Sequence, residues 1–262
     1  MLVGVISDIH ANIPALYATL DHFQDLGINS LLCAGDLVGY YTFPDQVIRE
    51  LSNHPDLVGL VMGNHDLCIA GGIFADRFTS DFMGTLTMAF MATENFDALQ
   101  AIGWGVKNTD RELARFLIQD NFFVDQFDGV GIAMLHGCPN AVCNEQMSEV
   151  NSYLPQNKVE ANKLALMDFL VHNKAQILIT GHTHLPYKVE IAPGILAINA
   201  GSVGQPRDGD PRASSATIEL ENGKIVAIDF HRVEYDLSET QKPIYGETDL
   251  PHSLAERLAQ GR

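Results

Sequence analysis

Short apolar runs alternate with amphipathic segments through the amino-terminal part of the chain, and this alternation constrains the fold more than any other feature. Runs at residues 2–6, 30–34 and 57–62 have the length and boundaries of buried strands. Two segments with helical spacing lie between them, at 13–27 and 44–54. Strand, helix, strand, helix and strand in this order predict parallel βαβ units and an α/β fold.

The remainder of the chain continues with strands but changes in character. Further strands are predicted at 122–127, 131–135, 176–180, 187–191, 195–198, 214–221 and 224–232. An amphipathic helix is predicted at 159–173. The last four runs are short and are joined by tight turns, so we expect them to form a second, largely antiparallel sheet.

The chain contains no internal repeat, and its length suits one large domain, which we take to span residues 1–262. Residues 71–120 contain Met and Phe among segments of helical spacing, and we interpret them as a helical insertion beside the sheet. From residue 233 the chain is a mostly polar tail that ends in a short helix, SLAERLAQ.

Polar motifs follow five of the predicted strands directly. In chain order they read Asp8-Ile9-His10, Gly35-Asp36, Gly63-Asn64-His65-Asp66, His136-Gly137 and Gly181-His182-Thr183-His184. Each motif alone has an ordinary explanation, such as a chance pair, a turn or a structural histidine. Ligands of open α/β sheets bind at the carboxyl ends of strands, however, and all five motifs fall at such ends. Their joint occurrence therefore predicts one shared site.

These motifs combine carboxylate, amide and imidazole groups, which together suit a transition-metal site. Mixed oxygen and nitrogen ligands favour Mn²⁺, Fe or Zn²⁺, whereas Mg²⁺ alone would prefer oxygens. Two ions roughly 3.5–4 Å apart can activate a bridging water and bind phosphoryl oxygens. We therefore expect two divalent metal ions, with Mn²⁺ as the first choice and Fe, Zn²⁺ or Ni²⁺ as alternatives, and a phosphate ester as the substrate.

The motifs SDIH, GD, GNHD, HG and GHTH together resemble the five blocks of the calcineurin-like metallophosphoesterases. The segment INAGSVGQPR at 198–207 extends the resemblance over most of the chain. It implies a four-layer αββα sandwich, in which two mixed β-sheets are flanked by helices. The chain is similar to the small bacterial and archaeal phosphoesterases rather than to protein Ser/Thr phosphatases, because Gly39 and Tyr40 replace the Asp and Arg of their GDxxDRG motif.

The resemblance also implies a set of metal ligands: Asp8, His10, Asp36, Asn64, His136, His182 and His184. Asp8, His10 and His184 would bind one ion. Asp36 would bridge to the second ion, which the remaining three residues would bind. The implied reaction is attack of a metal-bridging hydroxide on a small phosphomonoester or phosphodiester, with nucleotides and dinucleoside polyphosphates as leading substrate classes.

Three further residues are candidates for contact with the substrate. By the resemblance, His65 would be the catalytic residue that stabilises the phosphoryl oxygens or protonates the leaving oxygen. Its orienting partner is not identified. Arg207 or Arg212 could bind a substrate phosphate, since arginine binds phosphate in a bidentate manner. The alternative is that these arginines pair with Asp208 or Asp210 in the same loop.

Composition limits the partners and the compartment. The net charge of −17 repels polyanions, so long nucleic acid is a poor partner, whereas bound dications would attract a small phosphate compound locally. Neither a signal peptide nor an apolar run long enough to span a membrane is found, so we expect a cytoplasmic protein without membrane contact. The four cysteines form no CxxC pair, and we expect them to be reduced.

Two other functions stay open at this stage. A non-catalytic metal-binding scaffold on the same fold would be expected to lose ligands or the catalytic histidine, and none is missing here. A metal-dependent nuclease would have to act against the acidic surface. The sequence specifies neither the substrate, nor the choice among monoesterase, diesterase and dinucleoside polyphosphate hydrolase, nor the oligomeric state.

Overall fold

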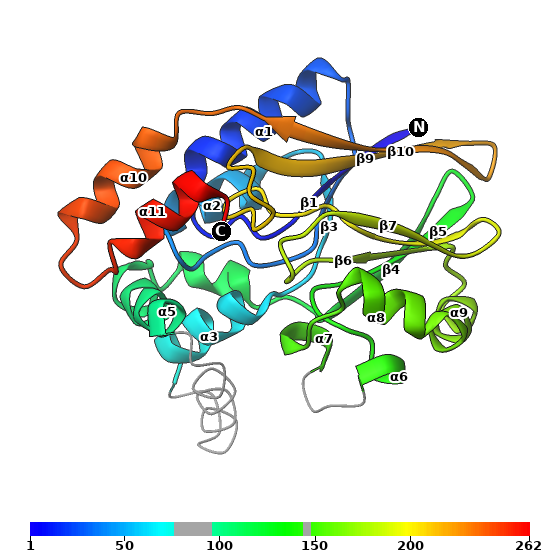
Figure 1. The fold of residues 1–262 in the computed structure, drawn as a ribbon, viewed down its shortest axis with the longest axis horizontal. Helices are drawn as coiled ribbons and strands as arrows, with labels where there is room; N and C mark the ends of the chain where they lie inside the picture. Colours follow the sequence, from blue (N-terminus) through cyan, green and yellow to red (C-terminus); the bar gives the residue numbers. More distant parts are fainter. Residues whose placement is uncertain (76–95, 144–147) are drawn as a thin grey trace.

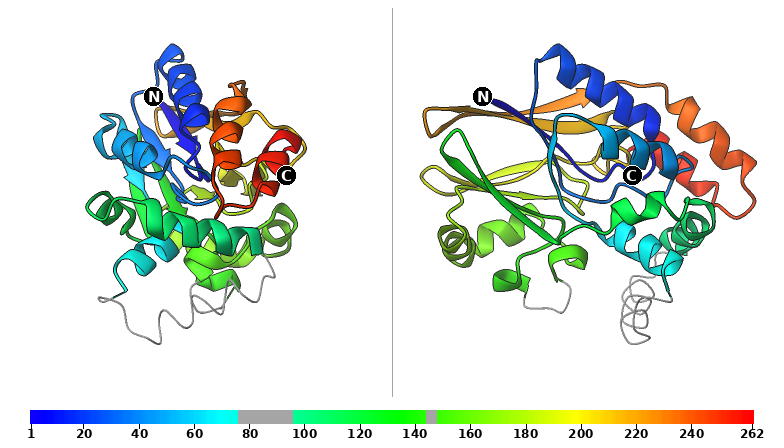
Figure 2. Two further views of the ribbon diagram at one scale, coloured as in Figure 1. Left: turned by 90° about the vertical axis from the view of Figure 1, so that its left-hand side faces the viewer. Right: turned by 180° about the vertical axis from the view of Figure 1, so that it is seen from behind.

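Two five-stranded sheets stack on each other between two layers of helices (Figure 1). The computed structural model describes residues 1–75, 96–143 and 148–262. Figure 2 shows the same layers from the side and from behind. The expected four-layer αββα architecture with two mixed sheets is confirmed.

The first sheet contains the amino-terminal strands and the last hairpin. Its strands, in the order β10-β9-β1-β2-β3, are β1 (Leu2–Ile6), β2 (Leu31–Cys33), β3 (Leu57–Leu60), β9 (Ala213–Glu221) and β10 (Lys224–Val233). The first three run parallel to one another, as the βαβ pattern predicts. The hairpin pairs antiparallel with β1 through β9.

The second sheet has the order β4-β5-β6-β8-β7. Its strands are β4 (Phe122–Phe127), β5 (Val130–Leu135), β6 (Ile177–Thr180), β7 (Tyr187–Ala192) and β8 (Ile195–Asn199). The three central strands are parallel, and the two edge strands are antiparallel to their neighbours. The parallel strands of this sheet carry two of the polar motifs at their carboxyl ends.

Helices cover the outer faces of both sheets. They are α1 (Ile13–Asp25), α2 (Pro44–Asn53), α3 (Asn64–Ile73), α5 (Phe96–Asn108), the 3₁₀ turn η1 (Leu113–Leu117), α6 (Asn140–Cys143), α7 (Ser148–Asn151), α8 (Gln156–Ala161), α9 (Lys163–His172), α10 (Leu237–Gly246) and α11 (Ser253–Gln260). Figure 1 shows α1 against the first sheet, and α8 and α9 against the second. No helix among the described residues is long and apolar enough to cross a bilayer.

Side chains alternate between two packing layers along the central strands, as the two-residue period of a strand requires. Val3 and Val5 of β1 point into the space between the sheets, whereas Ile6 packs toward the helices of the first layer. In β6, Ile179 points between the sheets and Leu178 packs toward α8 and α9. Strands with both faces buried read as continuous apolar runs, which explains why they were recognisable in the sequence.

The predicted arrangement of the last four strands is wrong in two respects. The second sheet is mixed rather than largely antiparallel, because β6 pairs parallel with both β5 and β8. Two of the last four strands, β7 and β8, lie in the second sheet, but β9 and β10 complete the first. The register pairs Val3 with Ile218 and Val5 with Ala216, which are buried on both strands. The burial of a central strand thus decides the pairing, and local periodicity carries no information about which distant strand is the neighbour.

The helix expected at 159–173 is divided into α8 and α9 at Asn162. Asn162 leaves the helical conformation, with φ −123° and ψ 25°, and its side-chain amide donates to the carbonyl of Lys158. Asparagine side chains compete for backbone groups in this manner, which favours helix ends over helix interiors.

The region interpreted as an insertion contains helices in its described parts, namely the end of α3, α5 and η1. Residues 76–95 of that region lie outside the described residues. From Val233 the chain forms α10 and α11, and the latter contains the SLAERLAQ helix. Ile244, Leu250, Leu254 and Leu258 of this part are buried against one another and their neighbours. The division into one domain with an insertion and a tail stays a prediction.

The cysteines differ from expectation at one pair. Cys138 and Cys143 form a disulfide, so the expectation that all four cysteines are reduced is wrong for these two. Cys33 and Cys68 are buried and free. The disulfide closes the short turn that follows His136, in which the backbone N–H of Cys143 donates to the carbonyl of Pro139 at 3.1 Å.

Candidate metal centre

The five polar motifs meet at one end of the two sheets. The motif residues directly follow β1, β2, β3, β5 and β6, whose carboxyl ends point the same way within each sheet. Five of the predicted metal ligands have a positive φ: Asp8 54°, His10 53°, Asp36 54°, His182 66° and His184 59°. This left-handed backbone is uncommon for residues other than glycine, and it clusters at functional sites.

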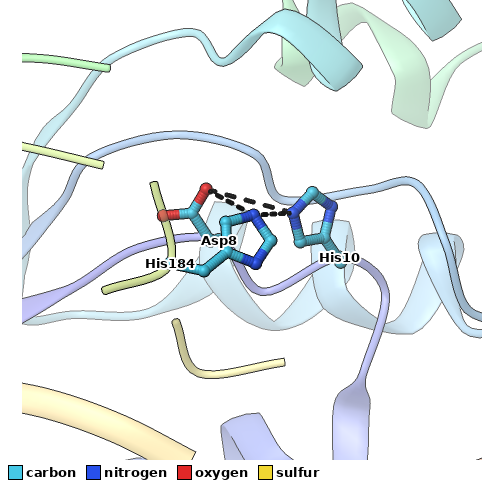
Figure 3. Close-up of side chains that lie close together, drawn as sticks. All are labelled: Asp8, His10 and His184. Carbon is cyan, nitrogen blue, oxygen red and sulfur yellow. Dashed lines mark hydrogen bonds and ion pairs between the residues drawn. The ribbon is translucent and has the colours of Figure 1, made fainter. Parts of the chain in front are cut away.

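The first cluster consists of Asp8, His10 and His184, whose side chains converge (Figure 3). The Nε2 atoms of the two histidines lie 3.1 Å apart. The Oδ1 atom of Asp8 is 3.4 Å from Nε2 of His184 and 3.9 Å from Nε2 of His10. All three residues are buried, so these groups face one another rather than water.

The second cluster adjoins the first and contains Asp36, His136 and His182. The Oδ2 atom of Asp36 lies 3.3 Å from Nε2 of His136 and 3.6 Å from Nε2 of His10, so one carboxylate oxygen faces both clusters. Asn64 joins the second cluster, because its Oδ1 atom is 3.0 Å from Nε2 of His136. The structure thus brings all seven predicted ligands together, with Asp36 between the two groups.

Backbone carbonyls fix which nitrogen of each imidazole faces the clusters. Nδ1 lies 3.3 Å from the carbonyl of Val38 in His10, 2.7 Å from that of Ala34 in His136, and 2.5 Å from that of Gln205 in His184. A nitrogen that faces a carbonyl carries the proton, so Nε2 of His10 and His184 is left as an acceptor with a lone pair directed at the cluster. In His136, burial disfavours the charged ring, but the neighbouring Asp36 raises the pKa to about 9, so a dication would have to displace the proton on Nε2. Ligating histidines are oriented by this kind of outer contact.

This arrangement fits a divalent metal. In the first cluster the two Nε2 atoms and Oδ1 of Asp8 face one another as acceptors. Lone pairs at these distances repel one another unless a cation binds there. In the second cluster, Nε2 of His182 is buried and has no hydrogen-bond partner within the described residues. Such an orphaned atom calls for an ion or a similar group.

Burial sets the protonation states that a metal site requires. It lowers the pKa of His10, His182 and His184 well below the ordinary histidine value, so these imidazoles are neutral at neutral pH. Neutral imidazole is the form that binds metals. Burial also raises the pKa of Asp8 to about 7. A bound dication would offset that cost, because it favours the ionised carboxylate.

His65 lies on the cavity side of the clusters, in the first turn of α3. Its backbone N–H donates to Oδ1 of Asp36 at 2.8 Å, and its ring lies 4.7 Å from the rings of Tyr40 and His10. A side chain at Gly39 would collide with Nδ1 of His65. An orienting aspartate at that position would therefore clash with His65, whose ring packs on those of Tyr40 and His10.

Asp66 has a structural role beside His65. Its carboxylate accepts hydrogen bonds from the N–H of Gly63 at 3.0 Å and from the N–H of Val38 at 3.1 Å. It thereby holds the start of α3 against the loop that follows β2. This contact places Asn64 and His65 toward the cluster rather than providing a partner for the His65 ring.

A cavity of about 260 Å³ opens over the clusters. The described residues that line it are Asp36, Tyr40, Asn64, His65, Ala98, Asn151, Tyr153, His182, His184 and Arg207. Sequence reasoning had no signal for Ala98, Asn151 or Tyr153, because none of them lies in a motif. Cys138 and Asn140 do not line this cavity; Asn140 donates instead to Glu149.

The structure separates the two candidate arginines. Arg207 lines the cavity, and its guanidinium donates to the hydroxyl of Tyr40 at 3.1 Å and to Oε1 of Gln205 at 2.9 Å. Arg212 lies in a bidentate ion pair with Asp210, with 45% of its side chain exposed. The alternative of an ion pair with an aspartate of the same loop is therefore correct for Arg212, whereas Arg207 can contact a ligand in the cavity.

The two adjoining Asp/His clusters at the strand ends of this α/β sandwich are candidate metal-binding sites. The chain belongs to the calcineurin-like phosphoesterase superfamily: the model of that superfamily's domain matches residues 1–223. This places the chain in the class of phosphoester hydrolases and agrees with divalent metal binding at the clusters.

Related proteins match the whole chain. A metallophosphoesterase from Sphaerobacter thermophilus is 28% identical, with a TM-score of 0.71 over 100% of this chain and 99% of its own. An uncharacterized protein of Methanocaldococcus jannaschii, MJ0912, is 29% identical over 100% of this chain and 98% of its own. The hypothetical protein PH1004 of Pyrococcus horikoshii shares the fold, with a TM-score of 0.78 at 18% identity over 100% of this chain and 98% of its own.

Proposed function

We propose that this protein is a dinuclear-metal phosphoesterase that hydrolyses a small phosphomonoester or phosphodiester. The observation that carries the proposal is the convergence of imidazole, carboxylate and amide acceptors in two clusters, with one oxygen of Asp36 facing both. Membership of the calcineurin-like superfamily supports the reaction class.

Each cluster would hold one ion. Asp8, His10 and His184 would bind the first, and Asn64, His136 and His182 the second, with Asp36 shared. When bound, the pair of ions supplies the Lewis acidity that activates water and neutralises phosphoryl oxygens. The mixed ligand set favours Mn²⁺, with Fe, Zn²⁺ or Ni²⁺ as alternatives.

The protein's own side chains would bind and orient the substrate. His65 lies at the cavity wall, where its imidazole can donate a hydrogen bond to a phosphoryl oxygen. Burial lowers the pKa of His65 to about 4, so donation of a proton to the leaving oxygen would require a bound phosphate that favours the charged ring. Arg207 would bind a further phosphate oxygen, because its guanidinium stays charged and lines the same cavity. Arg212 is not included, since Asp210 already occupies its donors.

The volume of the cavity and the net charge of the protein favour a small substrate. The cavity of about 260 Å³ is smaller than the roughly 300–1,000 Å³ typical of sites for drug-sized ligands. The net charge of −17 disfavours a long polyanion, whereas a small phosphate compound needs only local attraction. Nucleotides and dinucleoside polyphosphates are the leading classes.

A substrate panel tests this function. Purified protein loaded with Mn²⁺ is assayed on a chromogenic monoester, a chromogenic diester, cyclic nucleotides and dinucleoside polyphosphates. We expect hydrolysis of at least one small ester, loss of that activity after chelation, and its recovery when Mn²⁺ is restored. A labelled DNA duplex should show no binding at moderate salt. Tight, salt-dependent duplex binding would favour a nuclease, and no metal-dependent hydrolysis at all would favour a scaffold.

A further inference from the structure

Arg207 has an unusual setting for a buried cation. Its guanidinium donates to two neutral groups, the hydroxyl of Tyr40 and the side-chain carbonyl of Gln205, and the phenol of Tyr153 is a third neutral partner. Within the described residues, no carboxylate lies within ion-pair distance of it, and its buried Nε has no hydrogen-bond partner. A buried charge without a counterion costs free energy, so the arrangement suits an anion that binds in the cavity.

Tyr40 connects this cation to the metal centre. Its side chain is 2% exposed, and its ring lies 4.6 Å from the ring of His10 and 4.7 Å from that of His65. The guanidinium of Arg207 lies 5.8 Å from the Tyr40 ring centroid, and that of Arg257 from α11 lies at the same distance. Tyr40 is therefore fixed by packing before any ligand binds.

The hydroxyl of Tyr40 determines which N–H groups of Arg207 can bind a ligand. The ring packs against two histidines and leaves the hydroxyl beside the guanidinium, 3.1 Å from Nη2. Gln205 accepts from the same Nη2 atom at 2.9 Å. Both acceptors therefore bind Nη2, so neither of them occupies the donors of Nη1 or Nε. The remaining N–H groups of this charged side chain, which lines the cavity, can each donate to one oxygen of a bound phosphate.

We propose that Tyr40 is a positioning residue that holds Arg207 in the orientation that binds a substrate phosphate. This inference rests on the proposed phosphoesterase function and adds a residue to it. Tyr40 acts through Arg207: its hydroxyl anchors one guanidinium nitrogen, and its ring, packed on His65, keeps the arginine and the catalytic histidine in a fixed relation.

A double-mutant cycle tests the coupling. Inorganic phosphate is titrated by calorimetry into Mn²⁺-loaded wild type, Tyr40→Phe, Arg207→Ala and the double variant. We expect the Kd to rise roughly tenfold to a hundredfold for Arg207→Ala and roughly threefold to tenfold for Tyr40→Phe, because hydrogen bonds to a charged group are lost or misdirected. In the double variant, Tyr40→Phe should add no further loss, since it acts only through Arg207.

Tyr187→Phe is the matched control. It removes another buried phenol hydroxyl, one that bonds the carbonyl of Leu154 and the hydroxyl of Thr180 and does not line the cavity. Its phosphate Kd should equal that of wild type. The metal content of every variant is measured beside the titration, and it should be unchanged.

The outcomes separate this inference from the proposed function. If wild type hydrolyses an ester and binds phosphate, but Tyr40→Phe binds phosphate as wild type does, the positioning role is wrong and the phosphoesterase stands. Additive losses in the double variant would also overturn the role, because they would mean that Tyr40 acts independently of Arg207. If wild type neither hydrolyses esters nor binds phosphate, both the positioning role of Tyr40 and the phosphoesterase function are wrong.

Discussion

Asp36→Ala is expected to release bound metal and to abolish hydrolysis. One oxygen of this carboxylate faces His10 at 3.6 Å and His136 at 3.3 Å, so its loss removes a ligand from both clusters at once. Outer-shell partners of metal ligands typically contribute about 10–100-fold in affinity, and a shared ligand should contribute more than that. We expect a loss of more than roughly a hundredfold in metal affinity and no measurable turnover.

Metal content after dialysis, measured by elemental analysis, checks this prediction. Asp229→Ala is the control, because Asp229 is exposed on β10 and lies outside both clusters. It should keep full metal content and activity. Circular dichroism establishes that the Asp36 variant is folded. A folded Asp36→Ala protein that still holds two ions would contradict the assignment of Asp36 as the shared ligand.

His65→Ala is expected to retain metal and lose turnover by roughly 10²–10⁴, the usual contribution of a positioned acid–base group. The ring lines the cavity, whereas the backbone N–H of the same residue makes the contact to Asp36. Removing the ring therefore leaves that hydrogen bond in place. The two variants should therefore differ: Asp36→Ala loses bound metal, whereas His65→Ala keeps the metal and loses turnover.

The measurement is kcat on two esters, one with a good leaving group and one with a poor one. An equal loss on both indicates stabilisation of phosphoryl oxygens, and a larger loss on the poor leaving group indicates proton donation. His172→Ala, which removes an exposed imidazole at the end of α9, should match wild type. Near-normal turnover of His65→Ala on the poor leaving group would show that His65 is not catalytic.

The fold could be predicted from the sequence where burial repeats locally. β1, β5 and β6 are apolar on both faces because helices and the opposite sheet cover them, and such runs are legible. The sequence did not predict that β9 pairs with β1. That pairing joins residues far apart in the chain, and the residue pattern of a strand does not specify which distant strand is its neighbour.

The candidate site divides in the same way. The predicted ligands lie in short motifs directly after strands, so the position of the strand ends implied their convergence. Tyr153 could not be found, because it follows no motif; its ring lies 4.2 Å from the ring of His182 only in the folded chain. Arg207 and Arg212 are equivalent in the sequence, and the fold alone directs one to the cavity and the other to Asp210.

The number of metal ions bound per chain decides whether the two clusters form a dinuclear centre. Purified chain is equilibrated with Mn²⁺, separated from free metal and analysed for ions per chain. Because the two clusters adjoin and Asp36 faces both, we expect about two ions per chain, as a two-metal hydrolase requires. Saturation at one ion, or no retained ion, would contradict the dinuclear centre.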